Sequence, residues 1–505
     1  MFVVSASAKI IASSRALARG CAGLKSSEGI RWASSPARQW STPLAKTIAE
    51  AIATTGPISI AAYMRQCLTF PDGGYYTSQT QGKDQFGQKG DFITSPEISQ
   101  IFGELLGIWL VAEWMTQGRV RNGVEVIEVG PGRGTLMDDM LRTLSNFKPL
   151  ASSIESVYLV EASPALRDTQ KQLLCGDAPF EEIDIGFRST SKYSKVPVTW
   201  CADIRFVPND PSKTPFIFAH EFFDALPIHA FQSVPPNPST TAQVLTAPTA
   251  GLPLTKSTPQ SNTPQWRELV VTPTSPTSNI TTTTSPSTCR PQSDFQLSLA
   301  KASTPPSLLF PTLSQRYKAL LPTPGSVIEI SPESHSYAAD FAHRIGGSSP
   351  KPSSNGRSSR MVKIRPSGAA LILDYGPADT IPTTTLRGIR SHQAVSPLTD
   401  PGLVDISADV DFTALAEAAL AASLGVEVHG PVEQGEWLES MGIRERAEMI
   451  CKGLGEDEEG KKRVRGAMQR LVERGGGAMG KIYKFLAIVP EREGRRPVGF
   501  GGDVE

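Results

Sequence analysis

The chain has 505 residues, which is enough for a catalytic domain with additional segments. Its 50 basic and 50 acidic residues balance, so no global field attracts nucleic acid or an acidic membrane. The six cysteines form no C-x-x-C pair and the six histidines have no ligand spacing, so we expect no metal site. No apolar run approaches the roughly 18 residues that a membrane span needs, so we expect no membrane insertion.

The first 42 residues have a composition of their own. Ser and Ala are its commonest residues, six basic residues occur, and Glu28 is the single acid. A segment that is rich in Arg and Ser and poor in acids is typical of a mitochondrial presequence. We therefore predict a targeting presequence over residues 1–42; the alternative is an ordinary disordered tail.

Residues 43–122 have a mainly helical pattern. Thr42 is placed to cap a first helix, and a second helix is expected to start at Ser59. A long helix is predicted from Ser95 through Gln117, with a proline in its first turn, where a missing N–H is not costly. This part is expected to form a helical N-terminal subdomain.

From residue 123 the pattern alternates between short apolar strands and helices. Continuous β-branched and aromatic runs are typical of parallel strands that helices cover on both faces. We predict strands at residues 124–129, 157–161, 196–201, 216–219, 369–374 and 482–489. The expected fold is α/β, a doubly wound Rossmann-like sheet whose two parts span residues 123–233 and 309–489.

Two segments interrupt this core. Residues 234–308 are dominated by Thr, Ser and Pro and are expected to be disordered, except for a strand near 266–271 that we expect to pair with 228–231 in a hairpin. A second flexible segment is expected at residues 346–360. Residues 490–505 are expected to be a polar tail.

Residues 128–135 (EVGPGRGT) are the strongest chemical signal in the chain. They join the first parallel strand to a helix, for which Thr135 is expected to be the N-cap. Glycines at this position let the backbone approach a ligand at the carboxyl end of the sheet. The spacing is G-x-G-x-G rather than the G-x-G-x-x-G of dinucleotide-binding folds, and a carboxylate just before the loop would repel a pyrophosphate.

Acidic residues stand at the carboxyl ends of three successive predicted strands. Glu128 suits a ligand with an amino group and a sulfonium, Glu161 is placed to accept from a ribose diol, and Asp203 is placed to accept from an adenine amine. This set predicts S-adenosylmethionine rather than a nicotinamide dinucleotide, although strand-end acids can also be simply solvated. The candidates for binding this cofactor are Glu128, Gly130, Pro131, Gly132, Gly134, Thr135, Glu161 and Asp203.

Four distinctive sequence motifs, called words below, occur in this order: residues 90–100 (GDFITSPEISQ), 128–135, 221–227 (EFFDALP) and 405–412 (DISADVDF). In these words the chain resembles the MidA-like family, over about residues 46–489 apart from the Thr/Ser/Pro segments. One departure concerns His220, because the family usually has Asn before the EFFD word. Any contact of this side chain with cofactor or acceptor would therefore be altered.

The MidA-like family consists of mitochondrial complex I assembly factors with a methyltransferase fold. The resemblance implies a protein arginine methyltransferase of the mitochondrial matrix that uses S-adenosylmethionine. It implies a core subunit of complex I as the protein substrate during assembly, and symmetric dimethylation as the product. It does not imply an oligomeric state.

Transfer of a methyl group from a sulfonium is an in-line displacement, so catalysis depends chiefly on positioning. A guanidinium is a poor nucleophile, and carboxylates that bind it bidentately would orient one nitrogen and take charge. We expect Glu221, after the fourth strand, to be the main catalytic residue, with Asp224 nearby. By analogy with other arginine methyltransferases, Glu268 or Glu329 would supply a second carboxylate.

The word at residues 90–100 is expected to cover the cofactor, with Thr94 and Ser95 binding its methionyl carboxylate at a helix start, although Ser95 could instead cap that helix. Further candidates for the acceptor cleft, equally open to a structural role, are Tyr76, Asp374 and His392. Two alternative functions remain open: a methyltransferase with a small-molecule acceptor, and a methyltransferase-fold chaperone that does not catalyse.

Overall fold

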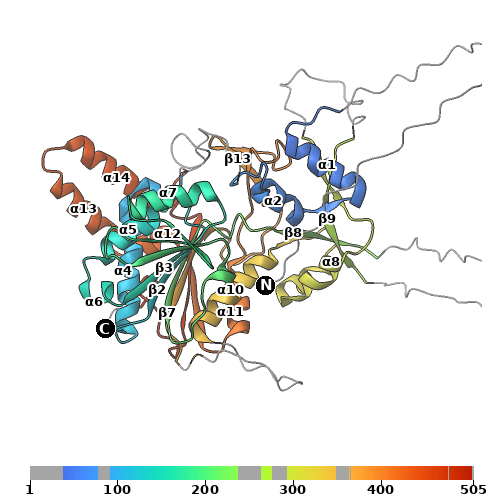
Figure 1. Ribbon diagram of the computed structural model, residues 1–505. Helices are drawn as coiled ribbons and strands as arrows, with labels where there is room; N and C mark the ends of the chain where they lie inside the picture. The colour runs from blue at the N-terminus through green and yellow to red at the C-terminus, as the bar shows by residue number, and fades with distance from the viewer. Residues whose placement is uncertain are drawn as a thin grey trace, which may run out of the picture. The chain divides into compact units, whose positions relative to one another are not determined.

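The structure is a computed structural model that describes residues 38–77, 91, 93–236, 263–275, 293–347, 363, 365–475 and 477–502. Nearly all of the predicted presequence and most of the two predicted flexible segments lie outside the described residues. Figure 1 shows the arrangement of the helices and strands.

The elements have the following bounds. The strands are β1 (Ile58–Ser59), β2 (Val124–Val129), β3 (Ile154–Val160), β4 (Glu181–Ile183), β5 (Gly186–Thr190), β6 (Pro197–Cys201), β7 (Thr214–His220), β8 (His229–Val234), β9 (Gln265–Pro273), β10 (Phe295–Leu299), β11 (Val327–Ile330), β12 (Ala369–Tyr375), β13 (Arg387–Arg390), β14 (Gln393–Val395), β15 (Asp405–Ser407), β16 (Val426–Glu433) and β17 (Tyr483–Pro490). The α-helices are α1 (Pro43–Thr55), α2 (Ile60–Thr69), α3 (Ser95–Ile98), α4 (Gln100–Thr116), α5 (Thr135–Leu144), α6 (Lys148–Ala151), α7 (Pro164–Cys175), α8 (Pro305–Leu309), α9 (Gln315–Leu320), α10 (Pro332–Gly346), α11 (Phe412–Ala422), α12 (Gln434–Ser440), α13 (Ile443–Gly453) and α14 (Glu458–Val472).

The core is a nine-stranded sheet, counted over the described residues, in the order β16-β17-β12-β7-β2-β3-β6-β5-β4. The five central strands, from β12 to β6, run parallel. Antiparallel strands extend the sheet at both edges, β17 and β16 at one and β5 and β4 at the other. The predicted core strands are all present, and the doubly wound α/β fold class is confirmed.

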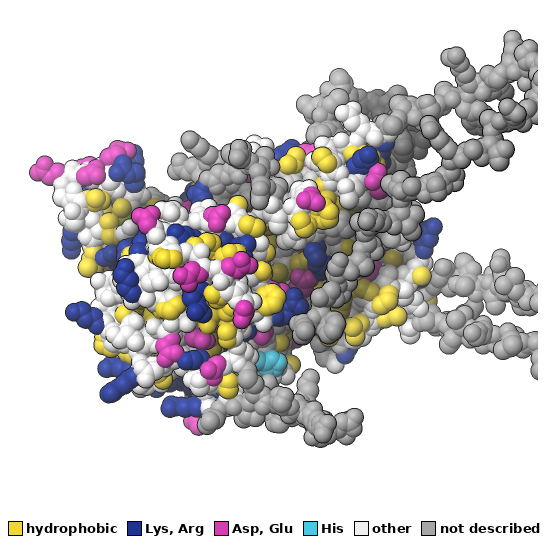
Figure 2. Space-filling model, in the orientation of Figure 1, with side chains coloured by type: hydrophobic (Ala, Val, Ile, Leu, Met, Phe, Trp, Pro, Cys, Tyr) yellow, Lys and Arg dark blue, Asp and Glu magenta, His cyan; other side chains and the backbone are white. Residues whose placement is uncertain are grey.

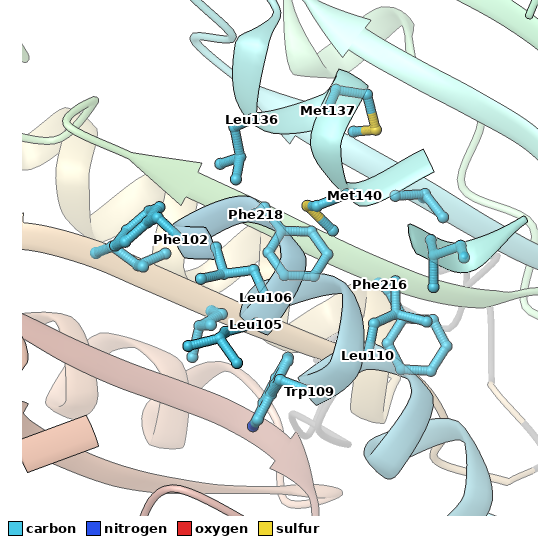
Figure 3. Packing of buried hydrophobic residues seen from close by; sticks show 14 of the residues in the cluster. Phe102, Leu105, Leu106, Trp109, Leu110, Leu136, Met137, Met140, Phe216 and Phe218 are labelled. Carbon is cyan, nitrogen blue, oxygen red and sulfur yellow. The ribbon is translucent and has the colours of Figure 1, made fainter. Parts of the chain in front are cut away.

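Both faces of the central strands are buried, because successive side chains of a strand point to opposite faces. Phe216 and Phe218 of β7 pack against α4 and α5 on one face, and Figure 3 shows the side chains of these two helices around the two rings. Ile217 of the same strand packs in a second cluster with residues of α10 and α11. This two-sided burial explains why the strand reads as a continuous apolar run.

Two smaller sheets adjoin this core. One has the order β1-β9-β8-β11, with β10 also paired to β9, and its hairpin pairs Ala230 with Leu269, which confirms the predicted pairing. Helices α1 and α2 share an apolar cluster with it, in which the rings of Tyr63 and Phe295 meet edge to face at 5.5 Å between their centroids. The other small sheet has the order β14-β13-β15.

Two predicted details of the helices are wrong. The long helix from Ser95 is broken at Ser99, whose φ of −157° is extended and whose hydroxyl accepts from the amide of Ile101, so that α3 and α4 are separate. Serine competes in this way with the helical hydrogen bonds. The N-cap of α5 is Gly134, with a positive φ of 85°, and Thr135 is the first helical residue.

Part of the segment that was expected to be disordered is ordered. From residue 293 onward the chain forms β10 and α8, and Phe295 is buried between the first two helices and β9. The C-terminal segment also contributes to the core, because Phe500 is buried and the carbonyl of Val498 accepts from the indole N–H of Trp109. Tertiary contacts therefore supply order that the local composition does not predict.

The described residues bear on three expectations about composition. None of the helices among them combines the length and the apolar character of a bilayer span, and none of their His, Cys, Asp and Glu residues cluster in a set of three suited to a metal ion. Their four cysteines, Cys67, Cys175, Cys201 and Cys451, are buried thiols. On the face shown in Figure 2, basic and acidic side chains are interspersed.

Candidate functional site

A cavity of about 410 Å³ lies at the carboxyl ends of the central parallel strands. The chain segments that follow β2 and β7 both line this cavity. These two strands are neighbours, and the order of the strands in the sheet reverses between them. Folds of this kind bind their ligands at that point. The predicted site residues that line the cavity are Tyr76, Thr94, Glu128, Gly130, Pro131, Gly132, Thr135, Glu161, Glu221 and Asp224. Those that do not line it are Gly134, Ser95, Asp203, Glu268, Glu329, Asp374 and His392.

The glycine loop after β2 passes close to the segment after β7. Gly130 has a φ of +67°, and a Cβ added there would lie 2.6 Å from Cδ2 of Phe222, closer than a side chain permits. Gly134 has a φ of +85° as it caps α5. Both positions therefore require glycine: Gly130 for space and for its backbone conformation, and Gly134 for its backbone conformation.

Glu128 at the end of β2 supplies an unpaired carboxylate beside this loop. Its side chain is 2% exposed, and its Oε2 has no hydrogen-bond partner among the described residues. Burial, and then the charge of Glu161, raise the pKa of Glu128 to about 8. A buried carboxylate without a donor fits a ligand that carries positive charge, such as the amino group or the sulfonium of S-adenosylmethionine.

Glu161 after β3 is held in place by its neighbours. The amide of Ser163 donates to Oε1 at 2.8 Å, and the side-chain amide of Gln170 donates to Oε2 at 3.1 Å. The Nε2 of Gln170 also donates to the carbonyl of Gly132 at 2.6 Å, and its Oε1 accepts from the indole of Trp200 at 3.0 Å. Gln170 thus couples the glycine loop to the acid at the second strand end, a role that its sequence position on a helix does not indicate.

Asp203 is placed differently from the expectation. Its carboxylate caps a short 3₁₀ turn and pairs with Arg205 through two hydrogen bonds, of 2.9 and 2.7 Å. This pairing lowers the pKa of Asp203. Ala202, one residue earlier, lines the cavity instead.

The segment before α3 covers part of the cavity. Thr94 lines the cavity, whereas the buried Ser95 hydroxyl donates to Oε1 of Gln434 at 3.4 Å. Because α3 has only four residues, its dipole is too short to bind an anion strongly. An ion pair of 3.1 Å between Glu97 and Arg133 ties this segment to the glycine loop.

The turn after β7 holds Glu221 in a strained conformation. Glu221 has a φ of +47°, which is rare for a residue with a side chain. Oδ2 of the buried Asp374 accepts from the amides of Phe222, Phe223 and Asp224 at 3.1, 2.9 and 3.3 Å. Of the two roles open to Asp374, lining the acceptor cleft and a structural one, the structure shows the second: its carboxylate stabilises this turn, which directs Glu221 into the cavity.

Three carboxylates form an acidic wall in the cavity: Glu221, Asp224 and Asp405. Burial raises the pKa of each of them, and their mutual repulsion adds to the effect for Glu221 and Asp405. Oε1 of Glu221 is buried without a hydrogen-bond partner among the described residues. The nearby His220 does not supply a charge, because burial lowers its pKa to about 3.

Three predicted acceptor residues lie elsewhere, because other partners hold them. The carboxylate of Glu268 binds His229 at 2.7 Å and the hydroxyl of Thr304. Glu329 accepts from the amide of Thr385 at 3.0 Å. His392 is exposed, and its backbone amide donates to the carbonyl of Asp91.

The sequence reasoning missed several residues that line the cavity. Asp405 stands in the last of the four words but had no predicted role, and Tyr375 and Tyr483 come from strands that had been read only as core. The hydroxyl of Tyr375 donates to Oδ2 of Asp224. Among these residues, only the position of Asp405 at the start of a distinctive word gave a signal in the sequence.

Comparisons with known proteins agree with this geometry. Residues 105–432 match the family of S-adenosyl-L-methionine-dependent methyltransferases. The chain is 34% identical over 443 residues to the mitochondrial protein arginine methyltransferase NDUFAF7 of Xenopus laevis, covering 87% of this chain and 82% of that protein. It is 32% identical over 466 residues to the NDUFAF7 of Homo sapiens, covering 90% and 86%.

A solved structure shares the fold. The methyltransferase-like protein of Burkholderia thailandensis, bound to S-adenosyl-homocysteine, matches with a TM-score of 0.61 and 21% identity over 92% of this chain and 94% of that chain. The family match points to the same cofactor as the unpaired Glu128 beside the glycine loop. The chain belongs to the family of S-adenosyl-L-methionine-dependent methyltransferases that includes the mitochondrial NDUFAF7 proteins.

Proposed function

We propose that this methyltransferase modifies arginine side chains of a protein, with the acidic wall as the acceptor site. The observation that carries the proposal is the buried Oε1 of Glu221, which has no hydrogen-bond partner among the described residues and lies beside two further carboxylates. A guanidinium is planar, cationic and rich in donors, and it satisfies such oxygens. The names of the relatives, which are protein arginine methyltransferases, support the same acceptor.

The residues of the wall would position and deprotonate the acceptor. Bound S-adenosylmethionine would supply an electrophilic methyl group on a sulfonium. Glu221 would accept hydrogen bonds from the guanidinium and aim one nitrogen at the methyl carbon. Glu221 or Asp224 would accept the proton that the nitrogen loses as it gains the methyl group, while the sulfonium would leave with the bonding electron pair as a neutral thioether. Glu128 and Glu161 would hold the methionyl and ribose parts, and Thr94 would contact the methionyl carboxylate.

The finer assignments rest on the relatives and on the resemblance to the MidA-like family. We propose a mitochondrial matrix location, a core subunit of complex I as the substrate, and symmetric dimethylation as the product. The mitochondrial names of the relatives support the compartment. The predicted presequence lies outside the described residues, apart from its last five.

The test is a Glu221→Gln variant of the full chain, which keeps the shape and removes the charge. We expect methyl incorporation into matrix protein from cells that lack this enzyme to fall by at least about 100-fold, as is typical for a missing general base. S-adenosylhomocysteine should still bind with nearly the affinity of the unmodified chain, because the glycine loop is intact. Glu417→Gln, on the exposed side of α11, is the matched control.

Mass spectrometry of the methylated product separates the alternatives. Methylarginine in a complex I subunit, lost in the Glu221 variant, supports the proposal. Methyl incorporation only into small molecules, or methylarginine formed at an undiminished rate by the variant, contradicts it.

A further inference from the structure

We propose that Asp405, held by the hydroxyl of Tyr76, is the second carboxylate that binds the acceptor guanidinium together with Glu221. This inference rests on the proposed arginine acceptor and replaces the two acids, Glu268 and Glu329, that sequence analogy suggested. Its basis is a juxtaposition of elements that are far apart in the chain. Tyr76 follows α2, Asp405 begins β15, and Glu221 follows β7, yet all three line one cavity.

The first step of the argument is the geometry of Asp405. Its residue is 6% exposed, and it pairs across the small sheet with Ile389, which also lines the cavity. The hydroxyl of Tyr76 donates to Oδ1 of Asp405 at 2.8 Å. The ring of Tyr76 meets the ring of Tyr75 edge to face at 5.0 Å, which fixes the donor. A positioned carboxylate at a cavity wall is suited to bind a ligand.

The second step is the charge that surrounds it. The titratable groups that face Asp405 are Tyr75, Tyr76, Asp91, Asp224 and Glu221. Among the described residues, no Lys or Arg forms an ion pair with any member of the acidic wall. The charge of Arg387 acts on Asp224, but Arg387 lies over the ring of Tyr375 at 4.7 Å and pairs with Asp409 at 2.7 Å. Arg65 and Arg133 also line the cavity, but they pair with Glu333 and Glu97. The wall is therefore short of positive charge.

The third step concerns the kind of ligand that would supply the missing positive charge. Buried carboxylates that repel one another are stable in an empty cavity only if they hold protons, and burial with the charge of Asp224 raises the pKa of Asp405 to about 7. A cation between them would favour the ionised forms, so its binding would release protons. A guanidinium offers five donors in a plane and can bind two carboxylates at once, whereas a lysine ammonium is a compact point charge. The wall thus favours arginine over lysine.

Calorimetry measures this linkage directly. The full chain, saturated with S-adenosylhomocysteine, is titrated with a Gly-Arg-Gly peptide at pH 7 in two buffers that differ in ionisation enthalpy, which gives the number of protons released. We expect the unmodified chain to release protons and to prefer this peptide to Gly-Lys-Gly. Asp405→Asn should bind the arginine peptide at least about tenfold more weakly and release fewer protons.

Two further variants complete the test. Tyr76→Phe keeps the carboxylate but removes its donor, and we expect it to weaken binding less than Asp405→Asn does. Asp400→Asn is the matched control, because Asp400 lies in the loop between β14 and β15 and pairs with Arg390 away from the cavity. Unchanged affinity for S-adenosylhomocysteine in all three variants shows that they are folded.

The outcomes separate this inference from the proposed function. The inference is overturned if Asp405→Asn binds the peptide with the same affinity and releases as many protons as the unmodified chain. It is also overturned if the unmodified chain does not bind the peptide. If methylarginine forms while the apparent KM for acceptor is unchanged in Asp405→Asn, the arginine acceptor stands and the role of Asp405 falls. If the peptide binds with the expected linkage but no methylarginine forms, the binding role of Asp405 stands and the proposed reaction falls.

Discussion

Replacing Gln170 with leucine should disrupt the cofactor site without touching any residue of the glycine loop. Gln170 is fully buried on α7, and its side chain makes three hydrogen bonds, to Gly132, Glu161 and Trp200. Leucine has a similar volume, so the packing remains, but the carbonyl of Gly132, the carboxylate of Glu161 and the indole N–H of Trp200 each lose a partner. The change therefore isolates the polar contribution.

The size of the effect follows from these three bonds. A buried polar group left without its partner costs about 1–3 kcal/mol, and part of this is recovered by relaxation, so we expect a loss of about 3 kcal/mol in all. Some of the loss appears as lower stability of the folded chain. The rest appears in binding, because Glu161 and the backbone of Gly132 are no longer held in position. We expect S-adenosylhomocysteine to bind at least about tenfold more weakly, which corresponds to about 1.4 kcal/mol.

The assay is calorimetric titration with S-adenosylhomocysteine, combined with thermal unfolding of the free and the saturated protein. Gln172→Leu is the matched control, because Gln172 is exposed on the same helix. If Gln170→Leu binds and unfolds as the unmodified chain does, the coupling of the glycine loop to Glu161 through Gln170 is refuted. A loss of stability with full binding affinity would mean that the hydrogen bonds of Gln170 stabilise the fold but do not shape the cofactor site.

Two other predictions concern the same cofactor site. Gly130→Ala should lower the affinity for S-adenosylhomocysteine by at least about tenfold. Its Cβ would lie 2.6 Å from Cδ2 of Phe222, and a φ of +67° costs a residue with a side chain about 1–2 kcal/mol. Calorimetry measures the affinity, and Gly466→Ala on α14 is the control. The pKa of Glu128 is raised from 4.5 to about 8, so the folded chain holds a proton there that the unfolded chain releases. The stability that this carboxyl contributes is fully present below about pH 4.5 and is lost as the pH rises through about 8. The melting temperature of the cofactor-free protein should therefore fall more steeply between pH 5 and pH 8 than that of Glu128→Gln. The affinity of the unmodified chain for S-adenosylmethionine should rise over the same interval. Equal pH profiles of the two proteins would show that Glu128 is ionised throughout.

The sequence by itself determined the features that depend on local pattern. The apolar runs of β2 and β7 predicted a covered parallel sheet, because strands buried on both faces carry no polar alternation. The glycine spacing at residues 130–134 and the preceding Glu128 predicted the class of cofactor, since both act within one turn of the chain. The cap at Thr42 and the start of a second helix at Ser59 were also correct, because capping is a contact within three residues.

Only the tertiary structure decided which acids form the acceptor site. Glu329 and Asp405 are both buried acids in strands of the two smaller sheets, but the first is satisfied by Thr385 and the second faces a cavity. The sequence cannot distinguish them, because the difference lies in partners that are 56 and 329 residues away. The same reason applies to Asp374. Its carboxylate holds the turn at Glu221 only because β12 pairs with β7. Long-range pairing places each side chain, and its surroundings then determine its chemistry.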